Sequence, residues 1–319
     1  MNIDKSLIIS FVKSTERGAY GASQFKGGND KIAADKAAVD EMRNELNKIN
    51  MIGRIVIGEG EMDEAPMLYV DEEVGTKAGD KFDIAVDPLE GTNFTAKNLP
   101  NALSVLAVAR KGNLLKAPDI YMDKIAIGPN LPKDLVKLDF DVKKNLLLLC
   151  DAKKIKPSDL KACVLKRPRH NNIINTLNEI GAKINFINDG DVSGAISVAS
   201  KTNGNDIFLG IGGAPEGVLA AAALKCLGCQ MQSRLIFQNE KEKKKAKDLG
   251  IVDLNKIYTI DEMVKDDVIF CATGVTDGDL VKGISHEDKH FNSETFVLHL
   301  SSKTNKIIKN KNLKWTFLL

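Results

Sequence analysis

Four acidic side chains occur close together in the segment GEGEMDEAP, directly after an apolar run that predicts a short strand at 54–58. They are Glu59, Glu61, Asp63 and Glu64. Acidic loops are usually only solvated, so the cluster by itself is a weak indication of function. Its position at a strand end, with glycines that let the backbone approach a ligand closely, favours a cation site.

A second acidic segment, DPLEGT, has a more specific pattern. Asp87 ends a run of buried-type residues, where an unpaired carboxylate would be costly, and Glu90 adds a second carboxylate. Gly91 and Thr92 then offer backbone N–H groups and a hydroxyl, which phosphate oxygens require. Oxygen ligands of this kind suit Mg²⁺ or Mn²⁺ rather than zinc or copper. The alternative is a strand-end Asp beside a capping Thr.

Asp35 lies in a predicted helix, four residues before Val39, and therefore shares the apolar face of that helix. Lys31 lies one turn earlier on the same side. A carboxylate on an inward face is costly unless it is paired or holds a cation. Asp35 is therefore either a cation ligand or the partner of Lys31 in a surface ion pair.

Three later turns follow predicted strands and carry charged residues. The turn KRPRH, at 166–170, is basic, and arginine binds two phosphate oxygens at once through its planar fork. Asp189 and Asp191 suit hydrogen bonds from sugar hydroxyls. In GIGGAPEG, Pro215 is predicted at the first position of a helix and Glu216 in its first turn. Glu216 either binds a cation or only serves the helix dipole.

Several other chemistries lack their motifs. GIGGAPEG has Ala214 and Pro215 where the third glycine of a dinucleotide fingerprint would fall, and no P-loop sequence occurs. Cys226 and Cys229 form a C-x-x-C with no second pair at zinc-site spacing, and their alanine-rich surroundings favour a buried helix. The four histidines form no evident pair, which argues against a phosphohistidine route.

The elements that position these residues follow from the sequence pattern. A helix beginning near Asp30 has one apolar face, formed by Val39, Met42, Leu46 and Ile49. A strand over 81–87 is expected to stop at Pro88, and two strands are expected around a hairpin-like turn at 111–113. From residue 161 onward, strand, turn and helix alternate, which is typical of layered α/β proteins with sites at strand ends.

This pattern predicts a layered α/β fold. The chain becomes richer in lysine after residue 128, which suggests a boundary between two packed subdomains near residues 128–165. The first, 1–165, is expected to carry the metal-binding carboxylates. The second, 166–319, is expected to carry the phosphate and sugar contacts and Glu216.

The composition sets further limits. The 319 residues are 43% hydrophobic and 28% charged, with a formal net charge of +2, so neither nucleic acid nor a membrane is expected as a partner. The N-terminal apolar stretch is too short for a signal peptide, and no run is long enough to span a bilayer. Five scattered cysteines indicate reduced thiols. The predicted location is the cytoplasm.

Taken together, the motifs resemble those of the class II fructose-1,6-bisphosphatases of the bacterial glpX type, within the lithium-sensitive, inositol-monophosphatase-like phosphatases. The shared segments, in family order, are IGEGEMDEAPMLY, DPLEGT, IYMDKIAIGP, PRH, DGDV and GIGGAPEG. DPLEGT has Glu where inositol monophosphatases usually carry Asp, which favours the bisphosphatase branch. The fold implied is the sugar-phosphatase fold of that superfamily.

The resemblance implies a role for each matching residue. The implied metal ligands are Asp35, Glu59, Asp87, Glu90 and Glu216. Asp63 and Thr92 would orient and deprotonate the attacking water. The implied substrate contacts are Lys31, Glu90, Gly91, Thr92, Tyr121, Arg167, Pro168, Arg169, Asp189, Gly190, Asp191 and Gly213. Arg167 replaces a lysine that is common in the family, which changes reach and fork geometry at that position. Glu61 and Glu64 have no implied role.

The activity implied is the hydrolysis of fructose 1,6-bisphosphate to fructose 6-phosphate and phosphate, as in gluconeogenesis. Mn²⁺ or Mg²⁺, with two or more cations per site, would activate the water for direct in-line attack without a phosphoenzyme. A homo-oligomer, dimer or tetramer, is also implied. The alternatives are a sedoheptulose-1,7-bisphosphatase, an inositol-phosphate-type phosphatase or, more remotely, a non-catalytic sugar-phosphate-binding protein.

Overall fold

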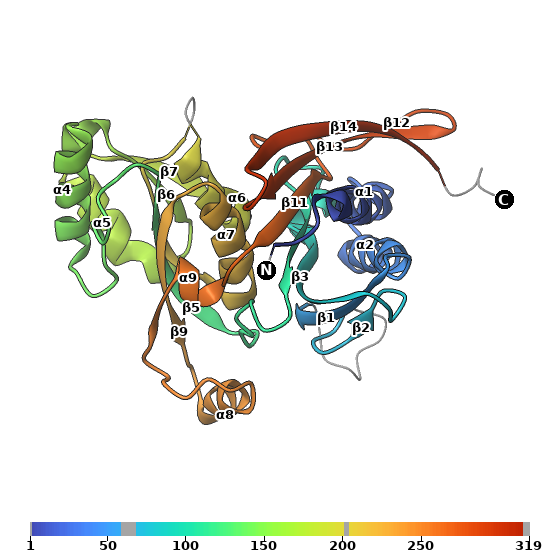
Figure 1. Cartoon of the computed structure of the whole chain (residues 1–319). Coiled ribbons are helices and arrows are strands. Elements are labelled where there is room, and N and C mark those ends of the chain that lie inside the picture. Colours follow the sequence, from blue (N-terminus) through green and yellow to red (C-terminus); the bar gives the residue numbers. More distant parts are fainter. Residues whose placement is uncertain (1, 59–67, 201–203, 315–319) are drawn as a thin grey trace. The chain divides into compact units, whose positions relative to one another are not determined.

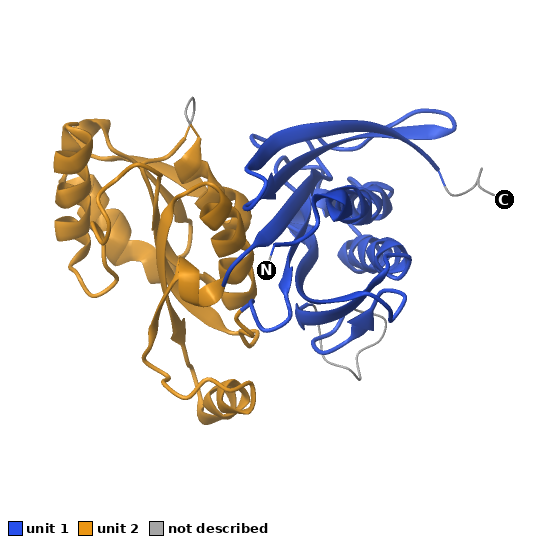
Figure 2. Cartoon of the chain, viewed as in Figure 1, with its two compact units in different colours: residues 1–114, 265–319 blue, residues 115–264 orange. Residues whose placement is uncertain are grey.

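The computed structural model describes residues 2–58, 68–200 and 204–314. The chain divides into two compact units (Figure 2): unit 1 comprises residues 1–114 and 265–319, and unit 2 comprises residues 115–264. Each unit has its own β-sheet, of eight strands in unit 1 and six in unit 2 among the described residues. The layered α/β class predicted from the sequence is confirmed. No helix of the described segments is long and apolar enough to cross a membrane.

Unit 1 packs helices against a mixed sheet. Its helices are η1 (Lys5–Leu7, a 3-10 turn), α1 (Ile8–Ser23), α2 (Lys31–Leu46) and α3 (Thr92–Ala96). Its strands are β1 (Met51–Ile57), β2 (Glu73–Val74), β3 (Asp80–Glu90), β4 (Leu103–Arg110), β11 (Val268–Gly274), β12 (Ser285–His286), β13 (His290–His299) and β14 (Thr304–Leu313). The strand order is β12-β13-β11-β4-β3-β1-β2, with β14 paired to β13. Helices α1 and α2 lie side by side and cover the sheet (Figure 1).

Helix α2 forms where the sequence pattern predicts it. The side chain of Asp30 caps the helix by accepting a hydrogen bond from the Ala33 N–H at 2.9 Å. The apolar residues Val39, Met42 and Leu46 are fully buried in the core of unit 1. Ile49 follows the end of the helix and is also buried. The predicted helix and its apolar face are confirmed.

Unit 2 shows the predicted alternation of strands and helices. Its strands are β5 (Tyr121–Ile127), β6 (Lys161–Leu165), β7 (Lys183–Ile187), β8 (Ile207–Gly213), β9 (Gln230–Ile236) and β10 (Ile257–Thr259). Its helices are α4 (Val142–Lys153), η2 (Pro157–Asp159), η3 (Pro168–His170), α5 (Asn171–Glu179), α6 (Asp191–Ile196), η4 (Ser197–Ala199), α7 (Ala214–Cys226), α8 (Glu240–Asp248) and α9 (Ile260–Met263). The order is β10-β9-β5-β8-β6-β7, with β6 parallel to both β7 and β8. Helices α4 and α5 lie on one face and α6 and α7 on the other (Figure 1).

Two local predictions are wrong. Strand β3 does not stop at Pro88 but continues to Glu90, because a register shift lets two residues oppose the single residue Ser104 of β4. Proline lacks an N–H, and a bulge is where a strand tolerates that loss. The second strand of the hairpin expected around 111–113 is also missing. Both edges of β4 are already occupied, by β3 and β11, so no edge is left for it.

The two units do not coincide with the expected halves 1–165 and 166–319. Strand β11 returns to the sheet of unit 1 and pairs antiparallel with β4, from Val268 opposite Ala109 to Gly274 opposite Leu103. The C-terminal strands therefore belong to the same unit as the N-terminal helices, and residues 115–264 form the other unit between them.

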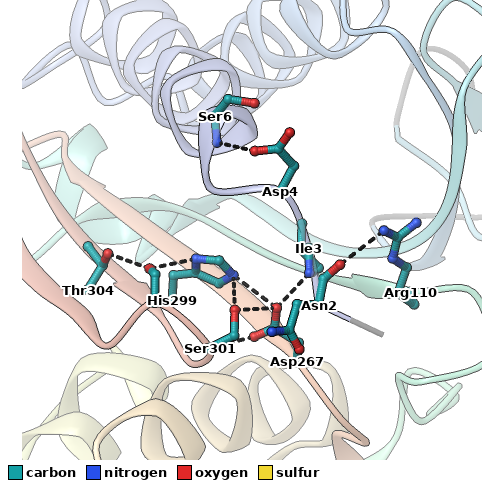
Figure 3. Close-up of polar contacts among 10 residues, drawn as sticks. Asn2, Ile3, Asp4, Ser6, Arg110, Asp267, His299, Ser301 and Thr304 are labelled. Atoms are coloured by element: carbon teal, nitrogen blue, oxygen red, sulfur yellow. Dashed lines mark hydrogen bonds and ion pairs between the residues drawn. The ribbon is translucent and has the colours of Figure 1, made fainter.

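A polar network in unit 1 links the N-terminal segment to these returning strands (Figure 3). The Ile3 N–H donates to Oδ2 of Asp267 at 2.7 Å, and the buried His299 lies 3.0 Å from the same oxygen. Ser301 donates through its N–H and through its hydroxyl, each at 2.8 Å. One carboxylate therefore joins the start of the chain, the residue before β11 and the turn between β13 and β14.

Candidate active site

The end of β3 carries four of the predicted site residues in one continuous segment. Asp87 is half-buried and accepts the N–H of Leu89 at 3.1 Å, while Glu90 is only 3% exposed. Gly91 caps α3 with a left-handed φ of 79°, and Thr92 is the first residue of that helix. The Thr92 hydroxyl donates to the carbonyl of Leu89 at 3.2 Å. The turn expected after the strand is therefore present, with its acids held inside the fold.

Helix α2 brings Asp35 to this part of unit 1, because α2 contacts both β3 and α3. Asp35 is half-buried, and its Oδ1 atom has almost no solvent exposure. Lys31, at the first position of the helix, is exposed. The other two acids predicted for unit 1, Glu59 and Asp63, lie outside the described residues, as do Glu61 and Glu64.

The basic turn of unit 2 is fixed by its own guanidinium groups. Arg167 donates to the carbonyl of Asn188 at 2.6 Å, which ties the turn to the segment that leads into Asp189. Arg169 donates to the carbonyl of Ile211 through Nε at 3.1 Å and Nη2 at 2.8 Å. Its guanidinium carbon lies 4.7 Å from the centre of the Tyr121 ring. Two predicted substrate contacts far apart in sequence, Tyr121 and Arg169, are thus in direct contact.

A buried lysine lies among the acidic side chains of unit 2. Lys124, in β5, is 1% exposed, and its ammonium group forms an ion pair with Asp191 and donates to the carbonyl of Gly213 at 2.7 Å. Asp191 is the first residue of α6 and is 7% exposed. Its carboxylate therefore faces a cation inside the fold. Asp189, two residues earlier, is half-buried.

Glu216 lies in the first turn of α7, close to the same lysine. Burial raises the pKa of Glu216, the positive charge of Lys124 opposes that rise, and the negative charges of Asp191 and Asp119 reinforce it. Pro215 lies in the same first turn, at the second helical position rather than the predicted first one.

The glycines of GIGG provide room for these side chains. A Cβ atom on Gly212 would lie 2.1 Å from the carboxylate of Asp191, and one on Gly213 would lie 1.9 Å from that of Glu216. A side chain at either position would displace an acid. Close packing against carboxylates therefore accounts for two of the glycines considered as a dinucleotide fingerprint.

The acids of unit 2 have properties that suit a bound cation. Oε2 of Glu216 and Oδ1 of Asp191 are buried, and no donor in the described part of the chain forms a hydrogen bond to either. A buried carboxylate oxygen without a donor is costly unless it takes up a proton or faces a cation. Within residues 2–58, 68–200 and 204–314, no three His, Cys, Asp or Glu side chains form a complete metal site. Glu59, a member of the expected ligand set, lies outside these residues.

Comparison with known proteins decides the family. A family model described as bacterial fructose-1,6-bisphosphatase, glpX-encoded, matches residues 5–312. The chain belongs to this family. The resemblance inferred from the motifs is therefore confirmed, over nearly the whole sequence.

Relatives with fructose-1,6-bisphosphatase names match almost end to end. The fructose-1,6-bisphosphatase class 2 of Haemophilus influenzae is 44% identical over 315 residues, which are 95% of this chain and 94% of that protein. The D-fructose 1,6-bisphosphatase class 2/sedoheptulose 1,7-bisphosphatase of Synechococcus sp. (strain JA-3-3Ab) is 40% identical over 98% of this chain and 97% of that protein. Among solved structures, the extragenic suppressor protein SuhB of Bartonella henselae aligns with a TM-score of 0.34 and 11% identity, over 61% of this chain and 74% of that one.

Sequence reasoning missed Lys124. Its strand neighbours Met122 and Ala126 are fully buried, and because side chains alternate along a strand, Lys124 must share their inward face. A lysine in phase with buried residues of a strand is therefore the pattern that could have revealed it. Its partners could not be read from the sequence, because Asp191 is far away along the chain.

Proposed function

We propose that this chain hydrolyses fructose 1,6-bisphosphate to fructose 6-phosphate and inorganic phosphate. The observation that carries the proposal is full-length membership of the glpX-encoded fructose-1,6-bisphosphatase family, with a class 2 enzyme 44% identical over 95% of the chain. The acids of β3 and α7 and the basic turn of unit 2 are of the residue types that this reaction needs. A phosphate monoester repels an attacking anion, so catalysis depends on positioning and on neutralisation of charge.

Arg167 and Arg169 are the proposed contacts to a phosphate group. Both guanidinium groups are held in place by main-chain carbonyls, which lowers the entropy lost when an anion binds. The Tyr121 ring packs against the Arg169 guanidinium group, at 4.7 Å from ring centre to guanidinium carbon. The other proposed substrate contacts are Lys31, Glu90, Gly91, Thr92, Tyr121, Pro168, Asp189, Gly190 and Gly213. Asp191 remains a proposed sugar contact, through the carboxylate oxygen that Lys124 does not hold.

The proposed ligands of the divalent cations are Asp35, Glu59, Asp87, Glu90 and Glu216. Bound Mn²⁺ or Mg²⁺ would neutralise phosphate charge and make a water molecule more acidic. Thr92 and Asp63 are the proposed groups that orient this water and accept its proton. The hydroxyl of Thr92, which donates to the Leu89 carbonyl, would have to exchange that bond for one to Asp63.

Sedoheptulose 1,7-bisphosphate is a second candidate substrate. The relatives from two Synechococcus strains carry both activities in their names and are 40% identical to this chain. The two sugars share the bisphosphate arrangement and differ by one carbon unit, so one pocket could accept both. We further propose a homo-oligomer and a cytoplasmic location, the latter supported by five free cysteine thiols.

Phosphate release from purified protein tests the proposed function. We expect release from fructose 1,6-bisphosphate with Mn²⁺ or Mg²⁺, none with excess EDTA, and recovery when the metal is restored. Sedoheptulose 1,7-bisphosphate and an inositol monophosphate serve as competing substrates. If a competing substrate is hydrolysed and fructose 1,6-bisphosphate is not, the proposed substrate is wrong. If EDTA does not reduce phosphate release, the proposed metal dependence is wrong.

One substitution tests the site. Glu90→Gln removes a charge from a buried side chain at almost constant volume, and turnover should fall at least about a hundredfold because a metal ligand is weakened. Glu240→Gln, on the exposed helix α8, is the matched control and should retain wild-type turnover. Wild-type turnover in purified Glu90→Gln would remove Glu90 from the site.

A further inference from the structure

His170 is a fully buried residue that ends the basic turn of unit 2. Each of its two ring nitrogens lies against the main chain of a strand. Nδ1 lies 2.6 Å from the carbonyl oxygen of Leu165, in β6, and Nε2 lies 2.8 Å from the peptide nitrogen of Ile211, in β8. The imidazole therefore bridges two strands beside the proposed phosphate contact.

These two partners fix the protonation state of the ring. A carbonyl oxygen can only accept a hydrogen bond, so Nδ1 must carry the proton, and a peptide N–H can only donate, so Nε2 must be bare. Burial lowers the pKa of His170, and the nearby charge of Arg169 adds to this effect. His170 is accordingly neutral at pH 7, as the Nδ1–H tautomer.

The preceding residue, Arg169, binds the carbonyl group of the same residue, Ile211. Arg169 donates to its carbonyl through Nε and Nη2, while His170 accepts from its N–H. Gly210, just before Ile211, has a φ of 136°, and a Cβ atom there would lie 2.9 Å from Nε2 of His170. The ring thus occupies the space of a side chain at Gly210 and sets the position of the carbonyl on which Arg169 rests.

We propose that His170 is a positioning residue for the phosphate contact made by Arg169, an inference that rests on the proposed function. His170 holds Ile211, the carbonyl of Ile211 holds one edge of the guanidinium fork, and the Tyr121 ring packs against the guanidinium group. Nε and Nη2 both bind the Ile211 carbonyl, so the proposed contact to the anion is made by Nη1. His170 touches neither the substrate nor the reacting atoms.

Protonation of His170 would break this arrangement. A proton on Nε2 would face the N–H of Ile211, so two donors would meet and the bond would be lost. The charged groups that act on the ring are Arg169, Asp191 and Asp123, and the first of these disfavours a second positive charge. Arg169 would therefore lose its fixed carbonyl as the pH falls through the pKa of His170.

Nuclear magnetic resonance tests the tautomer directly. In ¹⁵N-histidine-labelled protein, one of the four histidines should show a protonated Nδ1 and a bare Nε2 at pH 7, and His170→Gln should remove that signal. An Nε2–H tautomer for His170, or a charged ring at pH 7, would overturn the inference.

Three variants test the positioning role. His170→Asn retains an N–H donor for Leu165 but is too short to reach Ile211, so KM for fructose 1,6-bisphosphate should rise about tenfold while kcat changes less than about threefold. His170→Gln can place a carbonyl oxygen near the Ile211 N–H and should restore most of the affinity. His290→Gln, on β13 of unit 1, is the matched control and should leave KM unchanged. A wild-type KM in folded His170→Asn would overturn the inference.

A double variant and a pH series separate positioning from general damage. In an Arg169→Ala background, His170→Asn should add no further increase in KM, because its effect acts through Arg169. In wild type, KM should rise below the pKa of His170, which lies under the usual value of about 6.5, and His170→Gln should lack this rise. Ionisation of the substrate affects both proteins equally, so it cancels in the ratio of the wild-type KM to the KM of His170→Gln. Additive effects, or identical pH profiles, would contradict the inference.

Failure of the proposed function can be distinguished from failure of the positioning role of His170. Wild-type turnover of fructose 1,6-bisphosphate is measured first and tests the proposed function alone. Should it be absent, the same variants are compared for binding of inorganic phosphate by calorimetry. Weaker phosphate binding in His170→Asn than in His170→Gln would still support positioning of Arg169, and equal binding would contradict it.

Discussion

Lys124 illustrates how a single buried charge can determine the electrostatics of a site. Its ammonium group is 1% exposed and is shared by the Asp191 carboxylate and the Gly213 carbonyl, with Glu216 close by. A buried ion pair of this kind is not a strong source of stability in itself, because both ions lose their hydration. Removal of one partner is nevertheless costly, because the other charge stays behind in the interior.

The first prediction at this scale concerns Lys124→Met, which keeps the volume of the side chain but removes its charge. The free energy of unfolding should fall by about 3 kcal/mol, since Asp191 and Glu216 lose their nearby cation. The measurement is urea unfolding at pH 7 in the presence of EDTA. Lys143→Met removes an exposed pair with Glu179 and should have no measurable effect. The double variant Lys124→Met/Asp191→Leu should be more stable than Lys124→Met alone; a lower stability would contradict the pairing.

At the scale of the secondary-structure elements, short-range patterns in the sequence were sufficient for much of the fold. The cap and apolar face of α2, the strand–turn–helix units that begin at β6, β7 and β8, and the turn at Gly91 follow from residues adjacent in sequence. Pro88 was misjudged because a bulge depends on the facing strand, which the local sequence does not contain. The strand expected after 111–113 failed for a similar reason, since β11 occupies the edge of β4.

The candidate site also has some features that the local sequence shows and others that depend on contacts between distant residues. The acids at strand ends could be recognised from their positions in the sequence, and the motifs supplied the roles that are proposed for them. The contacts of Arg169 with Ile211 and Tyr121, and those of Lys124 with Asp191, join residues from different elements. No local pattern contains such pairs, because they arise only when the sheet of unit 2 is assembled.

The carboxylate of Asp267 yields a prediction about how the elements of unit 1 are joined (Figure 3). Burial would raise its pKa, but hydrogen bonds from Ile3 and Ser301, together with His299, hold the pKa below its usual value. A depressed carboxyl pKa stabilises the fold above the pKa of the unfolded chain, about 3.9, and this stability is lost as the pH falls through the folded value.

We therefore expect Asp267→Asn to destabilise the protein by about 1–3 kcal/mol at pH 7, because the uncharged amide cannot accept all four hydrogen bonds. The difference from wild type should shrink as the pH falls below about 3.9, where the unfolded chain begins to bind a proton that folded Asp267 does not, and it should disappear below the lower pKa of the folded state. Urea unfolding of wild type and Asp267→Asn at pH 7 and at pH 3.5 measures the destabilisation and its decrease in acid. Asp288→Asn, at an exposed turn, is the control. A difference that does not depend on pH would show that the charge of Asp267 is unimportant.

At the scale of the whole molecule, the chain enters and leaves unit 2 at neighbouring points. Leu115 donates its N–H to the carbonyl of Met263 at 2.8 Å, so the two ends of unit 2 are adjacent. Lys265 likewise donates to the carbonyl of Asn113 at 2.8 Å within unit 1. Each unit has its own sheet and apolar core. The composition change near residues 128–165 lies inside unit 2 and marks no break in packing. Residues 115–264 have the organisation of a domain inserted between two segments of another.

The last prediction follows from this organisation. Residues 115–264, expressed alone, should fold and unfold cooperatively in urea, because their core is internal and their length lies within the range of autonomous domains, about 50–250 residues. Residues 1–114 joined to 265–319 by a short glycine–serine linker should fold as well. Neither piece should release phosphate from fructose 1,6-bisphosphate, since neither contains all the proposed site residues: the proposed ligands Asp87 and Glu90 belong to one piece, and Glu216 and the proposed phosphate contact Arg169 belong to the other. A gradual, non-cooperative transition of the 115–264 fragment would mean that its stability depends on the rest of the chain.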